Sequence, residues 1–210
     1  MNDKGAKRGR FIVIEGIDGS GKSTQIQLLA NRLMANKRKV YTTAEPTVSL
    51  TGGMLRDALR GVTKKTTCEI ASMFLLDRIF HNVNPVNGIE KFLSAGVDVI
   101  CDRYYYSSLA YQGSETDFDW VLDMNLNCPE IRRPDLCIFL DISPKKAIER
   151  IGARGEAKEI YEKEETLALF RNTFLRVFDT LDDRVAVIDA DGTPDEVFSR
   201  ILTAVEPLLD

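Results

Sequence analysis

A glycine-rich segment near the start of the chain carries the clearest chemistry in the sequence. Residues Gly16–Ser23 read GIDGSGKS and fit the pattern Gly-x-x-x-x-Gly-Lys-Ser/Thr at every fixed position. Glycines let such a loop approach phosphate oxygens closely, and a helix starting there directs free N–H groups at them. Lys22 adds a positive charge for the outer phosphates, and Ser23 offers a hydroxyl to Mg²⁺. The predicted phosphate-binding residues are Gly16, Ile17, Asp18, Gly19, Ser20, Gly21, Lys22, Ser23 and Thr24.

A second cluster of polar residues follows a later apolar run, in the segment VDVICDRYYYSSLAYQG over Val97–Gly113. Asp102 can hold Mg²⁺ or its water, and Arg103 can grip a second phosphate through two parallel hydrogen bonds. An Asp–Arg surface pair at a helix start is the alternative interpretation. The helix that follows would carry further polar side chains on adjacent faces, namely Ser107, Ser108, Tyr111 and Gln112.

Two more segments contribute arginines. Phe74 and Arg78 are four residues apart, so they share one face of a predicted helix and together suit a flat base with carbonyl acceptors. Phe74 as a plain core residue is the alternative. Arg150 and Arg154 lie among small residues and glycines, a composition suited to a lid that excludes water and neutralises a phosphoryl group. An exposed turn with solvated charges is the alternative there.

These residues need a scaffold, and the chain alternates strand-like and helix-like segments. Helical patterns separate five short apolar runs, which predicts a parallel sheet with helices on both faces. We expect a P-loop NTPase-type three-layer α/β/α fold with a five-stranded parallel sheet, in a single domain over 1–210, with ligands beyond the carboxyl ends of the strands. The predicted strands are Phe11–Glu15, Val40–Thr43, Val97–Cys101, Leu136–Leu140 and Val185–Ile188.

Composition excludes several classes of function. The formal net charge of −4 argues against broad binding of nucleic acid or anionic membranes. The four cysteines form no Cys-x-x-Cys pair and the chain has one histidine, so a zinc site is not expected and the thiols are expected to stay reduced. We see no secretory signal and no apolar run of bilayer length, so a cytoplasmic location is the default expectation.

Taken together, the segments resemble the thymidylate kinase family from about Arg10 to the C-terminus. The markers are GIDGSGKST, the pair Glu45-Pro46, LLDRIFH around Arg78, DRYYYSSLAYQG, and the arginines near Gly155. The resemblance implies transfer of the terminal phosphate of ATP to dTMP, with Mg²⁺. It also implies a homodimer built through helices bordering Lys65–Asn82.

The resemblance also implies roles for particular residues. Lys22, Arg103, Arg150, Arg154 and Asp18 would be catalytic, with Ser23 and Asp102 at the metal. Asp18 would face the sugar 3′-hydroxyl, Phe74 would stack on thymine, Arg78 would donate to its O4, and Tyr111 would favour deoxyribose. The implied dTMP-binding residues are Asp18, Glu45, Arg56, Phe74, Arg78, Arg103, Ser107, Ser108, Tyr111 and Gln112.

Members of the family differ in where they place catalytic arginines. One group carries an arginine inside the phosphate loop, at the position of Gly19, and the other places arginines in the lid. Gly19 together with Arg150 and Arg154 resembles the second, bacterial-type group, with a mobile lid around 150–158.

Three points remain open. A related P-loop kinase for another nucleoside monophosphate or a deoxynucleoside has the same core motifs. A GTP-driven switch is less consistent, because Asp189–Gly192 follows the last strand and Asn36–Lys39 lacks the acidic residue that would read guanine. His81 is interpreted as a structural or partner-facing residue.

Overall fold

The sheet has the predicted five parallel strands. The computed structural model describes residues 8–153 and 164–209. The strands run in the order β2-β3-β1-β4-β5, and every neighbouring pair is parallel, which confirms the expected α/β fold class. Their bounds are β1 Phe11–Glu15, β2 Val40–Ala44, β3 Asp98–Asp102, β4 Leu136–Asp141 and β5 Val185–Asp189.

The central strand β1 is buried along its whole length, as its apolar sequence predicts. Ile14 pairs with Asp102 on one side, and Glu15 pairs with Phe139 on the other. The chain therefore leaves β1 and β3 at the same level of the sheet. This register brings the glycine loop and Arg103 to one edge.

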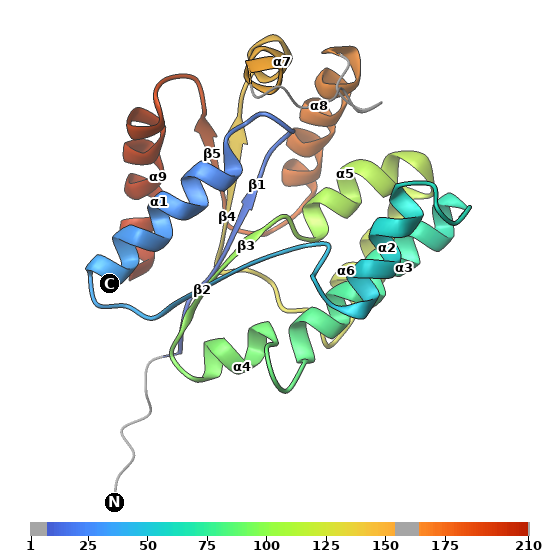
Figure 1. Cartoon of the computed structure of the whole chain (residues 1–210), viewed down its shortest axis with the longest axis horizontal. Coiled ribbons are helices and arrows are strands. Elements are labelled where there is room, and N and C mark those ends of the chain that lie inside the picture. Colours follow the sequence, from blue (N-terminus) through green and yellow to red (C-terminus); the bar gives the residue numbers. More distant parts are fainter. Residues whose placement is uncertain (1–7, 154–163, 210) are drawn as a thin grey trace, which may run out of the picture.

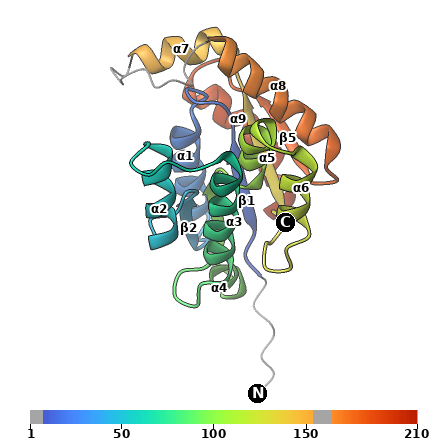
Figure 2. The ribbon, with the colours of Figure 1, turned by 90° about the vertical axis from the view of Figure 1, so that its right-hand side faces the viewer.

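Helices cover both faces of the sheet. The helices α1 and α9 lie together on one face, and α5 and α8 lie on the other (Figure 1). The bounds are α1 Lys22–Ala35, α2 Leu50–Leu59, α3 Thr67–Val83, α4 Ile89–Ser94, α5 Tyr105–Glu115, α6 Phe118–Leu126, α7 Pro144–Ala153, α8 Glu164–Thr180 and α9 Pro194–Leu209. Figure 2, a view turned by 90°, shows α7 and the start of α8 above the loop that follows β1.

Local signals explain most helix boundaries. Thr66 and Glu69 form a capping box at the start of α3, and that helix ends before Pro85, where a break is expected. Helix α2 begins at Leu50, where the Ser49 side chain accepts from Gly52 N and caps the helix.

The four cysteines are free thiols, with Cys101 and Cys137 buried in the sheet and Cys68 exposed on α3. Within residues 8–153 and 164–209, none of the helices has the length and apolar character needed to span a membrane.

Candidate active site

The glycine loop opens onto an uncapped helix start. Gly21 takes a left-handed conformation (φ 99°) before α1, and no side chain caps that helix. The first helical bond there runs from Gln25 N to Gly21 O at 3.1 Å, so the N–H groups of Lys22, Ser23 and Thr24 precede it. Gly19 (φ 82°) has no room for a side chain, since a Cβ would lie 2.5 Å from Ala147 O. The loop therefore presents backbone donors to an anion.

Lys22 is buried beneath this loop. Its Nζ donates to Gly16 O at 2.9 Å and to Ile17 O at 3.3 Å, and lies 3.7 Å from Asp18 Oδ1. Burial lowers the pKa of Lys22 to about 8, and the Arg103 charge acts in the same direction, against the nearby carboxylates. An incoming phosphate would stabilise the charged form.

Arg103 lies at the carboxyl end of β3 with a left-handed backbone (φ 65°), which is rare for a residue with a side chain. Its guanidinium contacts the Asp18 carboxylate and lies 3.3 Å from both Ser107 Oγ and Tyr111 Oη. Burial acts to raise the pKa of Asp18, but the charges of Arg103 and Lys22 hold it below its ordinary value. A carboxylate thus links the two cations at the centre of the site.

Glu15 is a site residue that the sequence analysis missed. This fully buried carboxylate accepts hydrogen bonds from Tyr104 N at 2.8 Å, Ser107 N at 3.2 Å and Ser107 Oγ at 2.8 Å. Burial raises the pKa of Glu15 to about 7, although Arg103 and these donors act to lower it. The available signal was a charged residue ending an apolar strand directly before the glycine loop. Glu15 anchors the turn that presents Arg103.

A cavity of about 230 Å³ lies on the Arg103 side of the loop. Most of the residues predicted for the second nucleotide line it: Asp18, Glu45, Phe74, Arg78, Arg103, Ser107, Tyr111 and Gln112. Residues not predicted also line it: Pro46, Leu59, Ile70, Tyr104 and Glu115. The cavity combines aromatic and aliphatic walls with a few polar groups, which is typical of a small-molecule site.

Two of the predicted residues, Ser108 and Arg56, are not among the residues that line this cavity. The Ser108 hydroxyl accepts from Arg78 Nη2 at 3.1 Å, so it supports that arginine. Arg56 on α2 donates from Nη1 to Pro46 O at 3.2 Å and to Thr47 O at 2.5 Å. In this geometry Arg56 holds the loop between β2 and α2.

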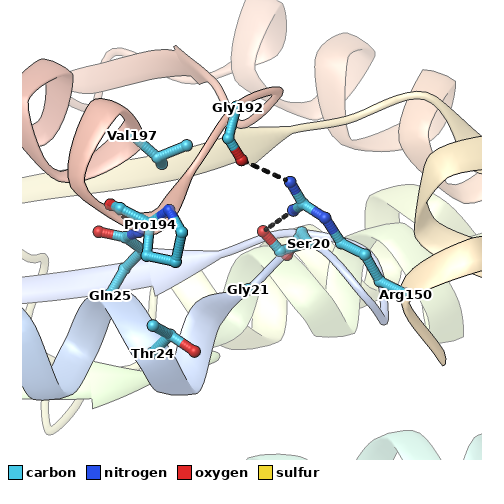
Figure 3. Close-up of a pocket in the computed structure, with 8 residues that line it drawn as sticks. All are labelled: Ser20, Gly21, Thr24, Gln25, Arg150, Gly192, Pro194 and Val197. Carbon is cyan, nitrogen blue, oxygen red and sulfur yellow. Dashed lines mark hydrogen bonds between the residues drawn. The ribbon is translucent and has the colours of Figure 1, made fainter. Parts of the chain in front are cut away.

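A second cavity, of about 160 Å³, lies on the other side of the loop. Arg150 on α7 reaches across it and donates to Ser20 O at 3.4 Å, Ala190 O at 3.0 Å and Gly192 O at 3.2 Å. Figure 3 shows the guanidinium between the glycine loop and the loop after β5. Arg154 and the rest of the expected lid lie outside the described residues. The cavity is lined by Ser20, Gly21, Thr24, Gln25, Arg150, Gly192, Pro194 and Val197.

The residues near the loop suit a magnesium ion that arrives with a nucleotide. Asp102 Oδ1 is buried without a hydrogen-bond partner, and Ser23 is exposed at the start of α1. Over the described parts of the chain, no three His, Cys, Asp or Glu side chains gather as a metal site. Mg²⁺ at such sites takes one or two protein oxygens and completes its shell with phosphates and waters, so this sparse set fits.

Comparison with known proteins identifies the family. The model of the thymidylate kinase family matches residues 14–201. The chain belongs to the thymidylate kinase family. A probable thymidylate kinase of Pyrococcus horikoshii is 36% identical over 205 residues, covering 95% of this chain and 97% of that protein. A thymidylate kinase of Akkermansia muciniphila is 39% identical over 207 residues, covering 98% and 95%.

A third relative, a thymidylate kinase of Desulfotalea psychrophila, is 40% identical over 161 residues, covering 76% of this chain and 77% of that protein. The chain is therefore an ATP-dependent nucleoside monophosphate kinase, and the resemblance in its motifs predicted the family correctly.

Proposed function

We propose that this thymidylate kinase family member transfers the γ-phosphate of ATP to dTMP, giving dTDP and ADP, with one nucleotide on each side of the glycine loop. The observation that supports this arrangement is the pair of cavities, one bordered by Ser20 and Gly21 and the other by Asp18 and Arg103. A GTP-driven switch binds one nucleotide and needs only the first cavity. A kinase that acts on a nucleoside monophosphate also needs the second cavity, which would hold the acceptor and its phosphate.

The donor nucleotide would lie on the side of Arg150. Its phosphates would bind the backbone N–H groups of residues 16–24 and the charge of Lys22, with the base toward Gly192 and Pro194. In this structure the Lys22 ammonium group donates to two carbonyl oxygens of the loop, and phosphate oxygens would replace them as acceptors.

The acceptor would occupy the larger cavity. The thymine ring would stack on Phe74 with its O4 toward Arg78, and Tyr111 would border the sugar. Arg103 would hold the acceptor phosphate, with Arg56 as a second contact, and Asp18 would face the sugar 3′-hydroxyl. Gln112 lines the same cavity and would lie near that phosphate.

For phosphoryl transfer the protein mainly has to align the two substrates and neutralise their phosphate charges. The acceptor oxygen of dTMP is already ionised, so no strong general base is required. Lys22 and Arg103 would neutralise the donor and acceptor phosphates while the loop holds them end to end. Ser23 and Asp102 would hold Mg²⁺, which supplies further positive charge at the donor phosphates.

We also propose the bacterial-type arrangement, in which lid arginines around 150–158 supply charge. The lack of space for a side chain at Gly19 supports this, because an arginine in the loop would collide with the backbone of α7. Replacing Arg154 by alanine would then lower turnover with little change in dTMP affinity. An equal collapse of dTMP affinity would contradict this role.

The proposed function is tested by ADP formation with each nucleoside monophosphate. We expect a clear preference for dTMP, and a preference for AMP, CMP or GMP would refute the proposal. A related kinase for another monophosphate or a deoxynucleoside is the alternative outcome.

We further propose a homodimer formed through α3. Leu76, Phe80 and Val83 are exposed at spacings of four and three residues, so they form one apolar stripe on that helix. Met54 and Trp120 extend the apolar surface beside it.

A cytoplasmic location accords with the free thiols.

A further inference from the structure

The chain's one histidine is buried beside the acceptor cavity. His81 lies on α3, one turn after Arg78, and is 4% exposed. Its Nδ1 is 2.9 Å from Glu45 Oε1, and its Nε2 is 2.8 Å from Thr43 Oγ1. Because Nδ1 faces a carboxylate, which can only accept, the Nδ1–H is the donor to Glu45, and Nε2 faces the threonine hydroxyl.

Glu45 connects His81 to Arg78. One of its oxygens, Oε1, accepts from the histidine, while Oε2 accepts from Arg78 Nε and lies 2.8 Å from Nη2. The carboxylate is buried along with both partners, at 5% exposure for the residue. The histidine therefore fixes the plane of the carboxylate that orients the arginine.

The donors of Arg78 are almost all used within the protein. A guanidinium has five N–H groups. Nε and one Nη2 hydrogen face Glu45, the other Nη2 hydrogen faces Ser108, and Nη1 donates to Asn125 Oδ1 at 2.5 Å. Among the described residues this leaves one hydrogen on Nη1, in a side chain that also lines the cavity.

We propose that His81 is a positioning residue for base recognition, acting through Glu45 to aim the last N–H of Arg78 at a carbonyl oxygen of the acceptor pyrimidine. This rests on the proposed placement of the base against Arg78. A pyrimidine with an amino group at that position would meet a fixed donor with no acceptor to offer. The histidine thus affects binding and selectivity and takes no part in phosphoryl transfer.

Two substitutions at His81 test this relay. His81→Leu removes the donor to Glu45, whereas His81→Asn keeps an N–H in the position of Nδ1. For His81→Leu we expect the KM for dTMP to rise about tenfold, as for a lost hydrogen bond to a charged group. The preference for dTMP over dCMP would fall, while kcat and the KM for ATP stay within about twofold. His81→Asn would restore most of the dTMP affinity.

A control separates positioning from general damage to the fold. Tyr106→Phe removes a partly buried hydrogen bond, 2.9 Å long, from the tyrosine hydroxyl to the Asp183 carboxylate; neither residue lines the cavity. At a matched loss of melting temperature this variant should leave the KM for dTMP unchanged. An unchanged dTMP KM in His81→Leu, or equal changes in both substrate KM values and kcat, would overturn the proposal.

A milder variant covers the case in which His81→Leu does not fold. Thr43→Val removes only the outer bond of the relay. A raised KM for dTMP with unchanged KM for ATP would support the relay, and no change would overturn it. The parent enzyme distinguishes the two proposals: if it does not prefer dTMP, the proposed function fails, whereas a dTMP preference unaffected by these variants refutes the relay alone.

Discussion

At the scale of single residues, Arg103 lies between the two proposed substrate sites, since its guanidinium contacts Asp18 beside Lys22 and lines the larger cavity. Replacing Arg103 by alanine would remove the proposed charge-assisted contact to the acceptor phosphate. We expect the KM for dTMP to rise by about tenfold to hundredfold with little change in the KM for ATP. Steady-state kinetics with each substrate varied in turn would measure this, and an unchanged dTMP KM would show that Arg103 has another role.

Glu15 predicts a pH dependence of stability. Its pKa rises from an ordinary 4.5 to about 7 because it is buried. Between pH 4.5 and about pH 7 the folded protein keeps a proton on Glu15 that the unfolded chain has released. The free energy of unfolding therefore falls as the pH rises through this range. Glu15 alone contributes a slope of at most about 1.4 kcal/mol per pH unit.

Urea unfolding of Glu15→Gln at pH 5 and pH 8 tests this. We expect the stability of the variant relative to the parent to improve at pH 8, because glutamine carries no proton to lose. The same difference at both pH values would show that Glu15 does not titrate in this range.

At the scale of elements, Asp77 on α3 fixes the segment between β2 and α2. Its buried carboxylate accepts from Thr47 N at 2.7 Å, Thr47 Oγ1 at 2.6 Å and Thr51 Oγ1 at 2.6 Å. Asp77→Ala leaves the Thr47 N–H without a partner, so we expect the free energy of unfolding to fall by about 1–3 kcal/mol.

Chemical denaturation measures this change. Asp57→Ala, at an exposed position on α2, is the control and should leave stability unchanged. A weaker dTMP affinity should accompany the Asp77 change, because Arg56 is bonded to the carbonyl of Thr47. If stability falls without any effect on dTMP binding, α2 does not depend on this segment for its placement.

The elements were predictable because their signals are local. The apolar runs and the glycines around residue 19 lie within a few positions of what they determine. The polar network behind the acceptor cavity was not predictable in this way. Glu45 meets His81, and Arg78 meets Asn125, only because β2, α3 and α6 converge. Asp77 was missed for the same reason, whereas the signal for Glu15 was local: a charged residue that ends an apolar strand directly before the glycine loop.

At the scale of the whole molecule, the stripe of Leu76, Phe80 and Val83 on α3 predicts self-association. Leu76→Asp places a charge in the proposed interface, and we expect analytical ultracentrifugation to show a shift from dimer to monomer. Met34→Asp is the matched control, because that side chain is 49% exposed, close to the 55% of Leu76, and lies on α1. A monomeric parent, or equal effects of both changes, would contradict the proposal.

At Arg103 the backbone conformation lowers thermal stability, whereas the side chain serves the proposed activity. Its left-handed conformation costs a residue with a side chain about 1 kcal/mol, a penalty that glycine escapes. Lys37 adopts the same conformation (φ 63°) in the turn after α1, away from both cavities. Directed evolution that rewards survival at high temperature would accept glycine at Lys37. At Arg103 the relief of backbone strain is set against the loss of the ion pair with Asp18, and a screen that also demands growth or turnover would retain the arginine.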